Sequence, residues 1–591
     1  MNSHSSNREI ITKLMFRLLP SQITLAAVPA VNGIVSGFFA TNYVGVDAMT
    51  AVGLYTPVGL FVSSVSVMLA GGSSIMCGKY LGKSQQDKLQ NIFSINLLIS
   101  TIIAAVLILL YVVMGVFDLT EFFTDEANVR PLFNTYLLGQ AIGILPLVLG
   151  TQLPAFLSIE NKGKRTMHAS LVYIAVNLIM NLLFIKVLHM ETFGLALAPS
   201  IGMWVFFLLE AQLFVSGKTL LRIRFENLQW GESIAVVKTG FPGAATNLYQ
   251  TARGLIVNKL IEIFVGGVGI SAFATANNLL AIFWAVPAGM LAVSRLLISV
   301  SVGEEDRQTL TDIMRVMFLR FVPLMCGISG LIIICAVPLT RIFYHDPSAP
   351  VYAMTVAGFS VLPLCMPLAV VCMHFTCYAQ VSGKQILVHA MSLLDGVINV
   401  TVFTALLIRY LGINSVYTSN IINGLLVMLV PVIYAAMNLK RLPRNMSELM
   451  SVPADFGVPE ENRMDMTIRS IEEVVSISVQ VQEFCASHGI DPKRSMLAAL
   501  ALEEMAGNIV DHGFTKDNKE HSIDVRVSLK DDDVILRTKD NCVPFDPAQR
   551  LKMASDQDDP ARNFGIKMVF KISKDVQYRN ILGLNVLTIR I

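Results

Sequence analysis

The part of this 591-residue chain that precedes Lys440 contains few charged side chains. It holds 24 Lys and Arg and 19 Asp and Glu, whereas the much shorter part from Lys440 to Ile591 holds 21 and 24. Because a soluble domain is about one-quarter charged, only the carboxy-terminal part has the composition of a water-soluble domain. The formal net charge of +2 gives no reason to expect nucleic-acid binding.

The eight cysteines are scattered, five of them in apolar runs, and form no CxxC pair, which argues against a zinc site and a disulfide framework. The chain also lacks the GxxxxGK[ST] loop, so ATP is not expected to drive each cycle of a pump. The amino terminus lacks the short apolar core and small-residue cleavage site of a signal peptide. We therefore expect the first apolar segment to be retained.

Long apolar segments dominate the chain before Lys440. A helix needs about 20 apolar residues to cross a bilayer, and twelve segments meet this length. We predict spans near 14–42, 47–76, 91–115, 132–158, 166–188, 193–216, 235–264, 269–300, 314–338, 351–379, 385–409 and 413–437.

Basic residues gather in alternate loops between these spans. They occur in the amino terminus and after the second, fourth, sixth and twelfth spans, as at Arg8, Lys83, Lys164, Arg222 and Arg441. Because Lys and Arg are enriched in cytoplasmic loops, we predict a multi-pass protein of the inner (plasma) membrane with both termini in the cytosol.

An internal repeat divides the membrane part. The tripeptide YVG at 43–45 recurs as FVG at 264–266, and GK at 163–164 recurs at 383–384, so the two pairs share nearly the same offset. A repeated six-span unit predicts two bundles, 1–220 and 221–444, with the substrate path between them.

The polar, proline-containing segment 445–466 is predicted to be a linker, and 467–591 a globular α/β domain. We expect helices at 467–488, 492–512 and 562–573. Strands are expected at 521–529, 533–539, 575–580 and 584–591.

The membrane part resembles the multidrug and toxic compound extrusion (MATE) family. The resemblance covers all twelve spans and is most specific at LP 19–20, YVG 43–45, GG 71–72 and GKYLGK 78–83. It implies a V-shaped pair of six-helix bundles around a central cavity. It also implies export of organic, often cationic, compounds in exchange for H⁺ or Na⁺.

Many bacterial members of that family carry an Asp in the first span and an Asn-xxx-Asp pair in the fifth, which bind the coupling cation. The matching positions here are Ser36, Asn177 and Asn181. Their oxygens can ligate Na⁺ weakly but cannot take up a proton near neutral pH. The resemblance therefore predicts a cation site in which proton coupling is lost or moved elsewhere.

Charged residues within spans are functional candidates, because their burial is unfavourable. Arg253 and Asp395 lie at similar depth in the seventh and eleventh spans, and we predict that they pair, either as a coupling or substrate site or as a fixed ion pair. Asn247 and Gln250 are predicted to line the cavity beside Arg253. Glu210, closer to the cytosolic end of its span, is expected to extend toward the interface.

One helix of the tail carries a polar face. Glu504, Asn508 and His512 follow each other at intervals of four residues, and Gly513 suits the end of a helix. An amide oxygen can bind Mg²⁺, and a carboxylate one turn away can orient or deprotonate a nucleophile. A solvated helix face would show the same spacing.

Two later motifs, DNCVPFDP at 540–547 and NFGI at 563–566, follow in the order found in histidine-kinase-like (GHKL) ATPases. Residues 465–591 resemble this family, and most closely the bacterial anti-sigma-factor serine kinases. The resemblance implies a two-layer α/β sandwich that binds ATP and Mg²⁺ between a mixed sheet and a lid.

By this resemblance Asn508 holds Mg²⁺, Glu504 is the general base, and Asp540 binds the adenine amino group. Phe545 and Gly565 lie in nucleotide-binding segments, as does Cys542, which replaces a usual Gly. Arg562 and Asn563 stand where the lid usually has glycines, so Arg562 or Lys567 is predicted to contact phosphate.

Three functions agree with these features. The first is a secondary active exporter of organic, often cationic, small molecules across the lipid bilayer, regulated by its ATP-binding-type domain. The second is a membrane-anchored sensor whose tail phosphorylates or sequesters a cytosolic protein partner. The third is a lipid-linked saccharide flippase. A tail that kept the fold only as a protein-interaction module is a further alternative.

Overall fold

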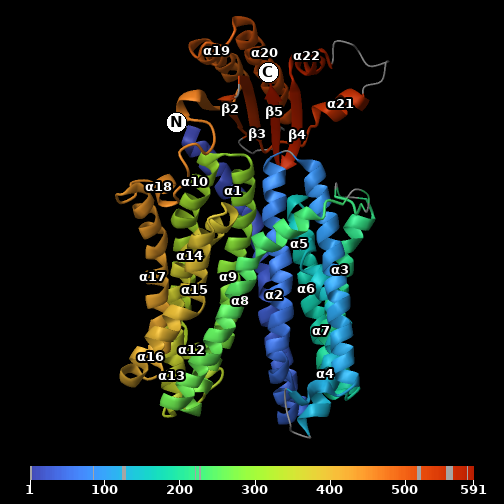
Figure 1. Ribbon diagram of the computed structural model, residues 1–591, viewed down its shortest axis with the longest axis vertical. Helices are drawn as coiled ribbons and strands as arrows, with labels where there is room; N and C mark the ends of the chain where they lie inside the picture. Colours follow the sequence, from blue (N-terminus) through green and yellow to red (C-terminus); the bar gives the residue numbers. More distant parts are fainter. Residues whose placement is uncertain are drawn as a thin grey trace. The chain divides into compact units, whose positions relative to one another are not determined.

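The structure is a computed structural model that describes residues 3–83, 85–122, 128–217, 219, 221–224, 226, 228–514, 521–530, 532–553, 563–581 and 583–591. The chain forms two compact units (Figure 1). The first, called the sheet-containing unit below, comprises Met1–Leu14, Glu304–Asp312 and Pro453–Ile591. The second, called the membrane unit, comprises Met15–Gly303 and Ile313–Val452.

The residues before the carboxy-terminal domain are almost entirely helical. The helices are α1 (Ser3–Phe39), α2 (Val46–Gly82), α3 (Gln86–Val116), α4 (Val129–Gly150), α5 (Leu153–Ile159), α6 (Gly163–Asn181), α7 (Glu191–Val215), α8 (Gly231–Phe264), α9 (Gly267–Gly303), α10 (Arg307–Val316), α11 (Val322–Ile334), α12 (Ala336–Arg341), α13 (Pro350–Val361), α14 (Cys365–Val381), α15 (Gln385–Leu393), α16 (Asn399–Leu411), α17 (Asn414–Leu439) and α18 (Met446–Leu449). Short π or 3₁₀ segments continue or join them, at η1 (Ala40–Val44), η2 (Leu119–Phe122), η3 (Leu182–Val187), η4 (Met317–Phe321), η5 (Leu362–Leu364) and η6 (Leu394–Ile398).

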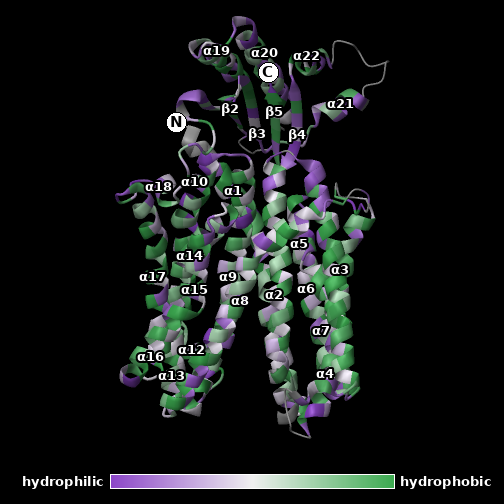
Figure 2. Cartoon of the chain, in the orientation of Figure 1, coloured by the Kyte–Doolittle hydropathy of each residue, from purple (hydrophilic) through white to green (hydrophobic). Residues whose placement is uncertain are grey.

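Eleven helical segments among the described residues are long and apolar enough to cross a membrane. They coincide with eleven of the twelve predicted spans. The remaining prediction, 235–264, forms the 34-residue helix α8, which contains Lys238, Arg253, Lys259 and Glu262 and is correspondingly less apolar. Figure 2 shows hydrophobic residues along the helices of the membrane unit and a more hydrophilic carboxy-terminal domain.

Glycines bring the two halves of the membrane unit into backbone contact. A Cβ at Gly240 of α8 would lie 3.0 Å from the amide nitrogen of Gly72 of α2, and it would overlap the carbonyl oxygen of Met68. A Cβ at Gly289 of α9 would lie 2.8 Å from the amide nitrogen of Ile23 of α1. Small residues of this kind let membrane helices approach closely.

One contact lies between positions that the internal repeat relates. Gly78 and Ser299 are separated along the chain by the same offset as the two copies of the YVG repeat. A Cβ at Gly78 would lie 2.5 Å from the Cβ of Ser299, so α2 and α9 touch there. Equivalent positions meet where a two-fold axis passes, so this contact agrees with the predicted duplication. The bundle boundary at residue 220, the V shape and the central cavity stay predictions.

The carboxy-terminal domain is built on a five-stranded sheet with the order β1-β2-β3-β5-β4. Its strands are β1 (Arg463–Ile468), β2 (Ile523–Lys530), β3 (Asp533–Asp540), β4 (Asp575–Ile581) and β5 (Leu584–Arg590). Every pairing is antiparallel, so the mixed sheet that the resemblance implied is wrong for the described strands. Two of these pairings, β2–β3 and β4–β5, are antiparallel because the strands form hairpins, whose turns use the positive φ of Asp532 and Gly583.

Helices cover one face of this sheet (Figure 1). They are α19 (Ile471–Ser487), α20 (Pro492–Asn508), the π turn η8 (Ile509–Gly513) and α22 (Phe564–Ile572), whereas the short helix α21 (Pro547–Met553) contacts α22. Buried residues of α19 and α20, such as Val481 and Leu502, pack on strand residues such as Val525 and Leu536. The sandwich that we predicted is present, but β1 begins within the predicted linker and α21 was not expected.

Candidate functional site

A cavity of about 150 Å³ opens at one end of the sandwich. It lies between the end of α20, the segment after β3, and strands β4 and β5. Its walls are Met505, Asn508, Ile509, His512, Gly513, Asp540, Cys542, Val543, Pro544, Phe545, Pro547, Tyr578, Asn585 and Leu587. Apolar side chains dominate this lining, with a few polar groups among them, which is the composition of a small-molecule site.

Asp540 is the buried carboxylate of this cavity. Its Oδ1 accepts hydrogen bonds from the amide of Cys542 at 2.9 Å and from Asn585 Nδ2 at 2.7 Å. Burial raises the pKa of Asp540 above its ordinary value, and the hydrogen bonds from Asn585 and Cys542 oppose this. The carboxylate is therefore held in one orientation at the wall of the cavity.

A second row of hydrogen bonds fixes Asn585 itself. Tyr578 donates to Asn585 Oδ1 at 2.7 Å and accepts from the amide of Phe545 at 3.1 Å. Burial raises the pKa of Tyr578 to about 12. The contacts of Asn585 with Asp540 and of Tyr578 with Phe545 were not predicted, because these partners are distant along the chain.

Only two of the three residues on the predicted polar helix face line the cavity. Asn508 and His512 both line the cavity, although the predicted helix 492–512 ends at Asn508 and continues as a π turn. Glu504 is not among the lining residues. Its carboxylate rests against Gly565 of α22, where an added Cβ would meet Oε1 at 2.6 Å and overlap Oε2. Gly565 thus makes room for the carboxylate.

The remaining predicted nucleotide residues take different positions. Cys542 is buried in the lining, and its Sγ lies 3.7 Å from His521 Nδ1. Phe545 is 42% exposed and also lines the cavity. Asn563 is buried as the residue before α22, and Lys567 is exposed. Arg562 lies outside the described residues.

On the outer face of the sheet, basic residues of β2 and β3 form ion pairs with an acidic loop. This set of ion pairs is called the acidic loop contact below. Glu304 and Asp306, both nearly fully buried, belong to the loop between α9 and α10. Asp306 Oδ1 lies 2.7 Å from Arg526 Nη1 of β2. Glu304 Oε2 lies 2.8 Å from Arg537 Nη2 and 3.2 Å from Lys539 Nζ of β3.

Asp306 also begins α10. Its Oδ1 accepts from the amide of Thr309 at 3.0 Å, as an N-cap residue does. Burial alone would raise the pKa of Asp306, but Arg526, Lys539 and Arg537 hold it well below the ordinary range. The carboxylate is therefore ionised and joins the start of α10 to β2. No local pattern predicts this contact, because the two segments that form it lie far apart along the chain.

The predicted cation site of the amino-terminal bundle is a chain of amides. Asn177 Nδ2 donates to Asn32 Oδ1 at 2.9 Å, and Asn181 Nδ2 donates to Asn177 Oδ1 at 2.8 Å. Ser36 Oγ is 3.5 Å from Asn32 Oδ1. Asn32, one turn before Ser36, was missed although it is the group of the first helix that contacts Asn177. Among the described residues, Asn181 Oδ1 is buried without a hydrogen-bond donor.

Arg253 and Asp395 lie together in the carboxy-terminal bundle. The guanidinium of Arg253 donates to the backbone carbonyl of Asp395 at 3.3 Å, while the Asp395 carboxylate accepts from Asn423 at 2.7 Å. Asn423 in turn accepts from Asn399 at 3.2 Å. The two residues are thus in contact through the backbone of Asp395, and their predicted role as a coupling or substrate site or as a fixed ion pair stays a prediction.

Gly396 permits this approach, since a Cβ there would lie 2.5 Å from the Cβ of Tyr249 on α8. Asn247 is half-buried and Gln250 is exposed on the same helix. Their placement in a transport cavity stays a prediction.

Comparison with known proteins agrees with this architecture. The MatE family profile matches residues 20–183 and 242–403, and the profile of the histidine kinase-like ATPase domain matches residues 469–591. The first match covers more than half of the chain. The chain is therefore a member of the MatE family of membrane proteins, with a histidine-kinase-like ATPase domain at its carboxy-terminal end.

Two curated relatives are both described as "Probable multidrug resistance protein NorM". The one from Geobacillus kaustophilus is 23% identical over 286 residues, which are 45% of this chain and 62% of the relative. The one from Bacillus licheniformis is 24% identical over 310 residues, 50% of this chain and 65% of the relative. The chain thus spans slightly less than two-thirds of each relative's length.

Solved structures share the fold of the membrane part. An outward-facing multidrug resistance MATE family transporter of the MOP superfamily superposes with a TM-score of 0.68 at 18% identity, covering 75% of this chain and 97% of that one. A MOP superfamily transporter from Pyrococcus furiosus gives a TM-score of 0.67 at 18% identity, covering 74% and 98%. These identities establish the fold alone.

Proposed function

We propose that the chain is a secondary active exporter of organic, including cationic, compounds in the plasma membrane, and that its cytosolic domain binds Mg-ATP and regulates transport. Family membership and the fold support the export function. The observation that carries the regulatory part is the acidic loop contact, because its loop is continuous with two membrane helices.

The chemistry of that contact favours a specific attachment. Arg526 and Arg537 stand directly opposite each other on β2 and β3, and like charges in that position repel. The carboxylates of Glu304 and Asp306 neutralise them. Removing one partner of a buried ion pair costs about 3–5 kcal/mol. A rearrangement of the sheet would thus act on the loop that connects α9 (Gly267–Gly303) and α10 (Arg307–Val316).

The cavity of the carboxy-terminal domain fits a nucleotide base. The buried Asp540 can accept a hydrogen bond from an adenine amino group, and the walls at Met505, Ile509 and Leu587 suit an apolar ring. Asn508 at the cavity wall would hold Mg²⁺ through its amide oxygen. Glu504, the proposed general base, is packed on Gly565 outside the lining, which favours nucleotide binding over turnover in this arrangement.

The coupling ion follows from the donor atoms available. The amide chain of the amino-terminal bundle holds no carboxylate, so it can offer Na⁺ only neutral oxygens, such as the unpartnered Oδ1 of Asn181 among the described residues. Arg253 and Asp395 form the charged counterpart in the other bundle. These groups support export driven by an ion gradient, with Na⁺ or H⁺ as the coupling ion.

Transport by the purified full-length chain in liposomes tests both parts of the proposal. Export of ethidium would be measured under an imposed pH or Na⁺ gradient, with and without Mg-ATP on the side of the carboxy-terminal domain. We expect gradient-driven export whose rate changes with Mg-ATP. In Asp540→Asn the effect of ATP should be lost while export persists, and Asp532→Asn, a change at an exposed turn, should behave as the wild type.

An ATP-independent rate in the wild type would refute regulation by the domain. Absence of export under every gradient, together with ATP-dependent phosphorylation of a cytosolic protein, would favour the sensor function. Movement of a lipid-linked saccharide in place of ethidium would favour the flippase.

A further inference from the structure

Glu210 is a fully buried carboxylic acid in the membrane unit. Its side chain is 0% exposed within α7, and neither of its carboxylate oxygens makes a hydrogen bond of standard geometry among the described residues. We expected this side chain to extend toward the interface, and that prediction is wrong. The side chain lies on the buried face that Gly202 and Phe206 also occupy, at intervals of four residues along the helix.

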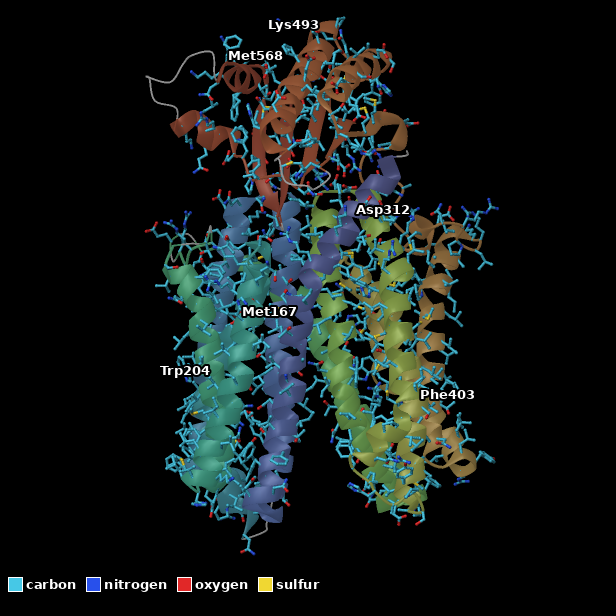
Figure 3. The ribbon with its side chains drawn as sticks, turned by 180° about the vertical axis from the view of Figure 1, so that it is seen from behind. Met167, Trp204, Asp312, Phe403, Lys493 and Met568 are labelled. Atoms are coloured by element: carbon cyan, nitrogen blue, oxygen red, sulfur yellow. The ribbon has the colours of Figure 1, made fainter. Side chains whose placement is uncertain are left out.

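That face packs on α6, and the two helices run antiparallel in a simple register. A Cβ at Gly202 would lie 3.0 Å from the ring of Tyr173, and Phe206 packs with Ala169 and Tyr173. One turn further, the register places Glu210 opposite Thr166, whose hydroxyl group is the side-chain neighbour of the Glu210 carboxyl group. Met167 and Trp204 mark the two helices in Figure 3, where they lie side by side.

Thr166 and Ser170 present two hydroxyl groups on this face of α6. Both residues are 0% exposed, and their hydroxyl oxygens make no hydrogen bond of standard geometry in the described part of the chain. The neighbouring basic residues of the same helix, Lys164, Arg165 and His168, are exposed on its other faces. The acid therefore has polar neighbours but no cation on α6.

The other elements packed against α7 do not supply a cation either. The ionisable side chains described on these elements are Tyr43 on η1, Tyr55, Cys77, Lys79 and Tyr80 on α2, Asp87, Lys88 and Tyr111 on α3, Arg130 and Tyr136 on α4, Glu160 after α5, Lys164, Arg165, His168 and Tyr173 on α6, and Lys186 on η3. None of these makes an ion pair or hydrogen bond with Glu210 among the residues that the structure describes. An ionised carboxylate is strongly unfavourable in such a place, so the neutral acid is the stable form.

We propose that Glu210 is a proton-binding site of the amino-terminal bundle, additional to the amide chain at Asn32, Asn177 and Asn181. In the present conformation a carboxylate oxygen holds the proton, and the neighbouring hydroxyls are available to it. When α6 and α7 separate and water enters, the carboxylate becomes the favoured form and the proton leaves. Coupling of this cycle to transport rests on the proposed export function.

A purely structural role makes a different prediction. A neutral amide has the same size as the protonated acid and could fill the same space with the same hydroxyl neighbours. If Glu210 only filled space, glutamine would replace it without consequence for transport. If it carries a proton, glutamine preserves folding and removes the response to pH.

The test compares full-length wild type, Glu210→Gln and the matched control Glu191→Gln. Glu191 is exposed at the first residue of the same helix. Infrared spectra would be recorded as a function of pH for the carbonyl stretch of a protonated carboxylic acid. We expect a band that persists above neutral pH in the wild type and in Glu191→Gln and is absent in Glu210→Gln. A wild-type spectrum identical to that of Glu210→Gln would overturn the proton site.

Ethidium export in liposomes is the second measurement. A pH gradient should drive export by the wild type and Glu191→Gln, and export by Glu210→Gln should fall at least tenfold with ethidium binding and thermal stability retained. Unchanged pH-driven export by Glu210→Gln would overturn the coupling role. If the wild type exports nothing under any gradient, the proposed function fails and the coupling with it, while the infrared band still decides whether Glu210 holds a proton.

Discussion

Asp306 Oδ1 lies 2.7 Å from Arg526 Nη1, and the same carboxylate caps the first turn of α10 through the amide of Thr309. One side chain thus belongs to two structures, the start of a helix that continues into the membrane unit and the outer face of the ATPase-domain sheet. Arg307, the next residue, donates to the backbone carbonyl of Ala454 at 3.1 Å. The segment leading to β1 is therefore attached to the same loop.

Asp306→Asn separates the two roles of this side chain. Asparagine is as good an N-cap as aspartate, so α10 keeps its first turn, but the negative charge between Arg526 and Arg537 is lost. We expect the sheet-containing unit to lose about 3–5 kcal/mol of stability. Hydrogen exchange of β2 and β3 amides in the full-length protein would measure the change.

Glu305→Gln is the control for that substitution. Glu305 pairs with Lys530 at 2.7 Å, but the side chains of Lys530 and Glu305 are 43% and 48% exposed. A surface pair of this kind contributes about 0–1 kcal/mol. Equal protection of β2 and β3 in Asp306→Asn and Glu305→Gln would contradict the importance of the buried pair.

The pH dependence of the acidic loop contact has a definite sign. Its three basic partners hold the pKa of Asp306 well below the ordinary value of 3.8, against the effect of burial. A carboxyl group whose pKa is lower in the folded state stabilises that state above its unfolded pKa. We expect this contribution to be constant at neutral pH and to be lost only as the pH falls below 3.8.

Loss of the acidic loop contact would be measured by proteolysis of the full-length protein between Leu442 and Arg463 as the pH is lowered. The wild type should resist cleavage down to the acidic range, whereas Asp306→Asn should be cleaved at neutral pH. Cleavage of the wild type that begins between pH 5 and pH 7 would be inconsistent with an ionised Asp306.

The approach of α2 and α8 makes Gly240 intolerant of a side chain. A Cβ there would overlap the carbonyl oxygen of Met68, so Gly240→Ala must separate the two helices. We expect a loss of about 1–3 kcal/mol in detergent. Gly254→Ala on the same helix meets no atom within 4 Å and should be neutral. Thermal unfolding of the two variants, followed by size-exclusion chromatography, makes the comparison, and equal melting temperatures would argue against the close crossing.

Gly565 and Glu504 should behave as a coupled pair. Gly565→Ala introduces a Cβ where the Glu504 carboxylate lies, so we expect it to destabilise the sheet-containing unit by about 1–3 kcal/mol. In the background of Glu504→Ala the clash is gone and the same substitution should have little effect. A double-mutant cycle on denaturant unfolding measures the coupling. Additive effects would show that the two groups do not touch.

Local patterns were enough to predict much of this architecture. Apolar length placed eleven helices that are able to cross a membrane, and the motifs at 540–547 and 563–566 identified the ATPase fold. The spacing of Asn508 and His512 also placed them on one wall of a cavity. These features depend on neighbouring residues, which a sequence displays directly.

The errors have a common physical origin in contacts between distant segments. Most of strand β1 was taken for linker because its short run, Arg463–Ile468, becomes a strand only by pairing with β2, which follows two helices later. Asn32 was overlooked because its importance lies in the hydrogen bond with Asn177. The position of Glu210 along α7 can be read from the sequence, and it suggested that the side chain reaches the interface. The helix face that Glu210 occupies could not be read from the sequence.

The order of the membrane helices and the class of the carboxy-terminal domain could be predicted from the sequence, since hydrophobic length and motif order are properties of the chain, and the duplication stays a prediction from the repeat offset. The surroundings of the charged side chains depend on the tertiary structure. It buried Glu210 with no cation beside it among the described residues, set Glu504 against Gly565, and placed Asp306 on Arg526. Each of these outcomes depends on which helix face or strand register meets another, because the free energy of a charge is set by the partners that folding brings to it.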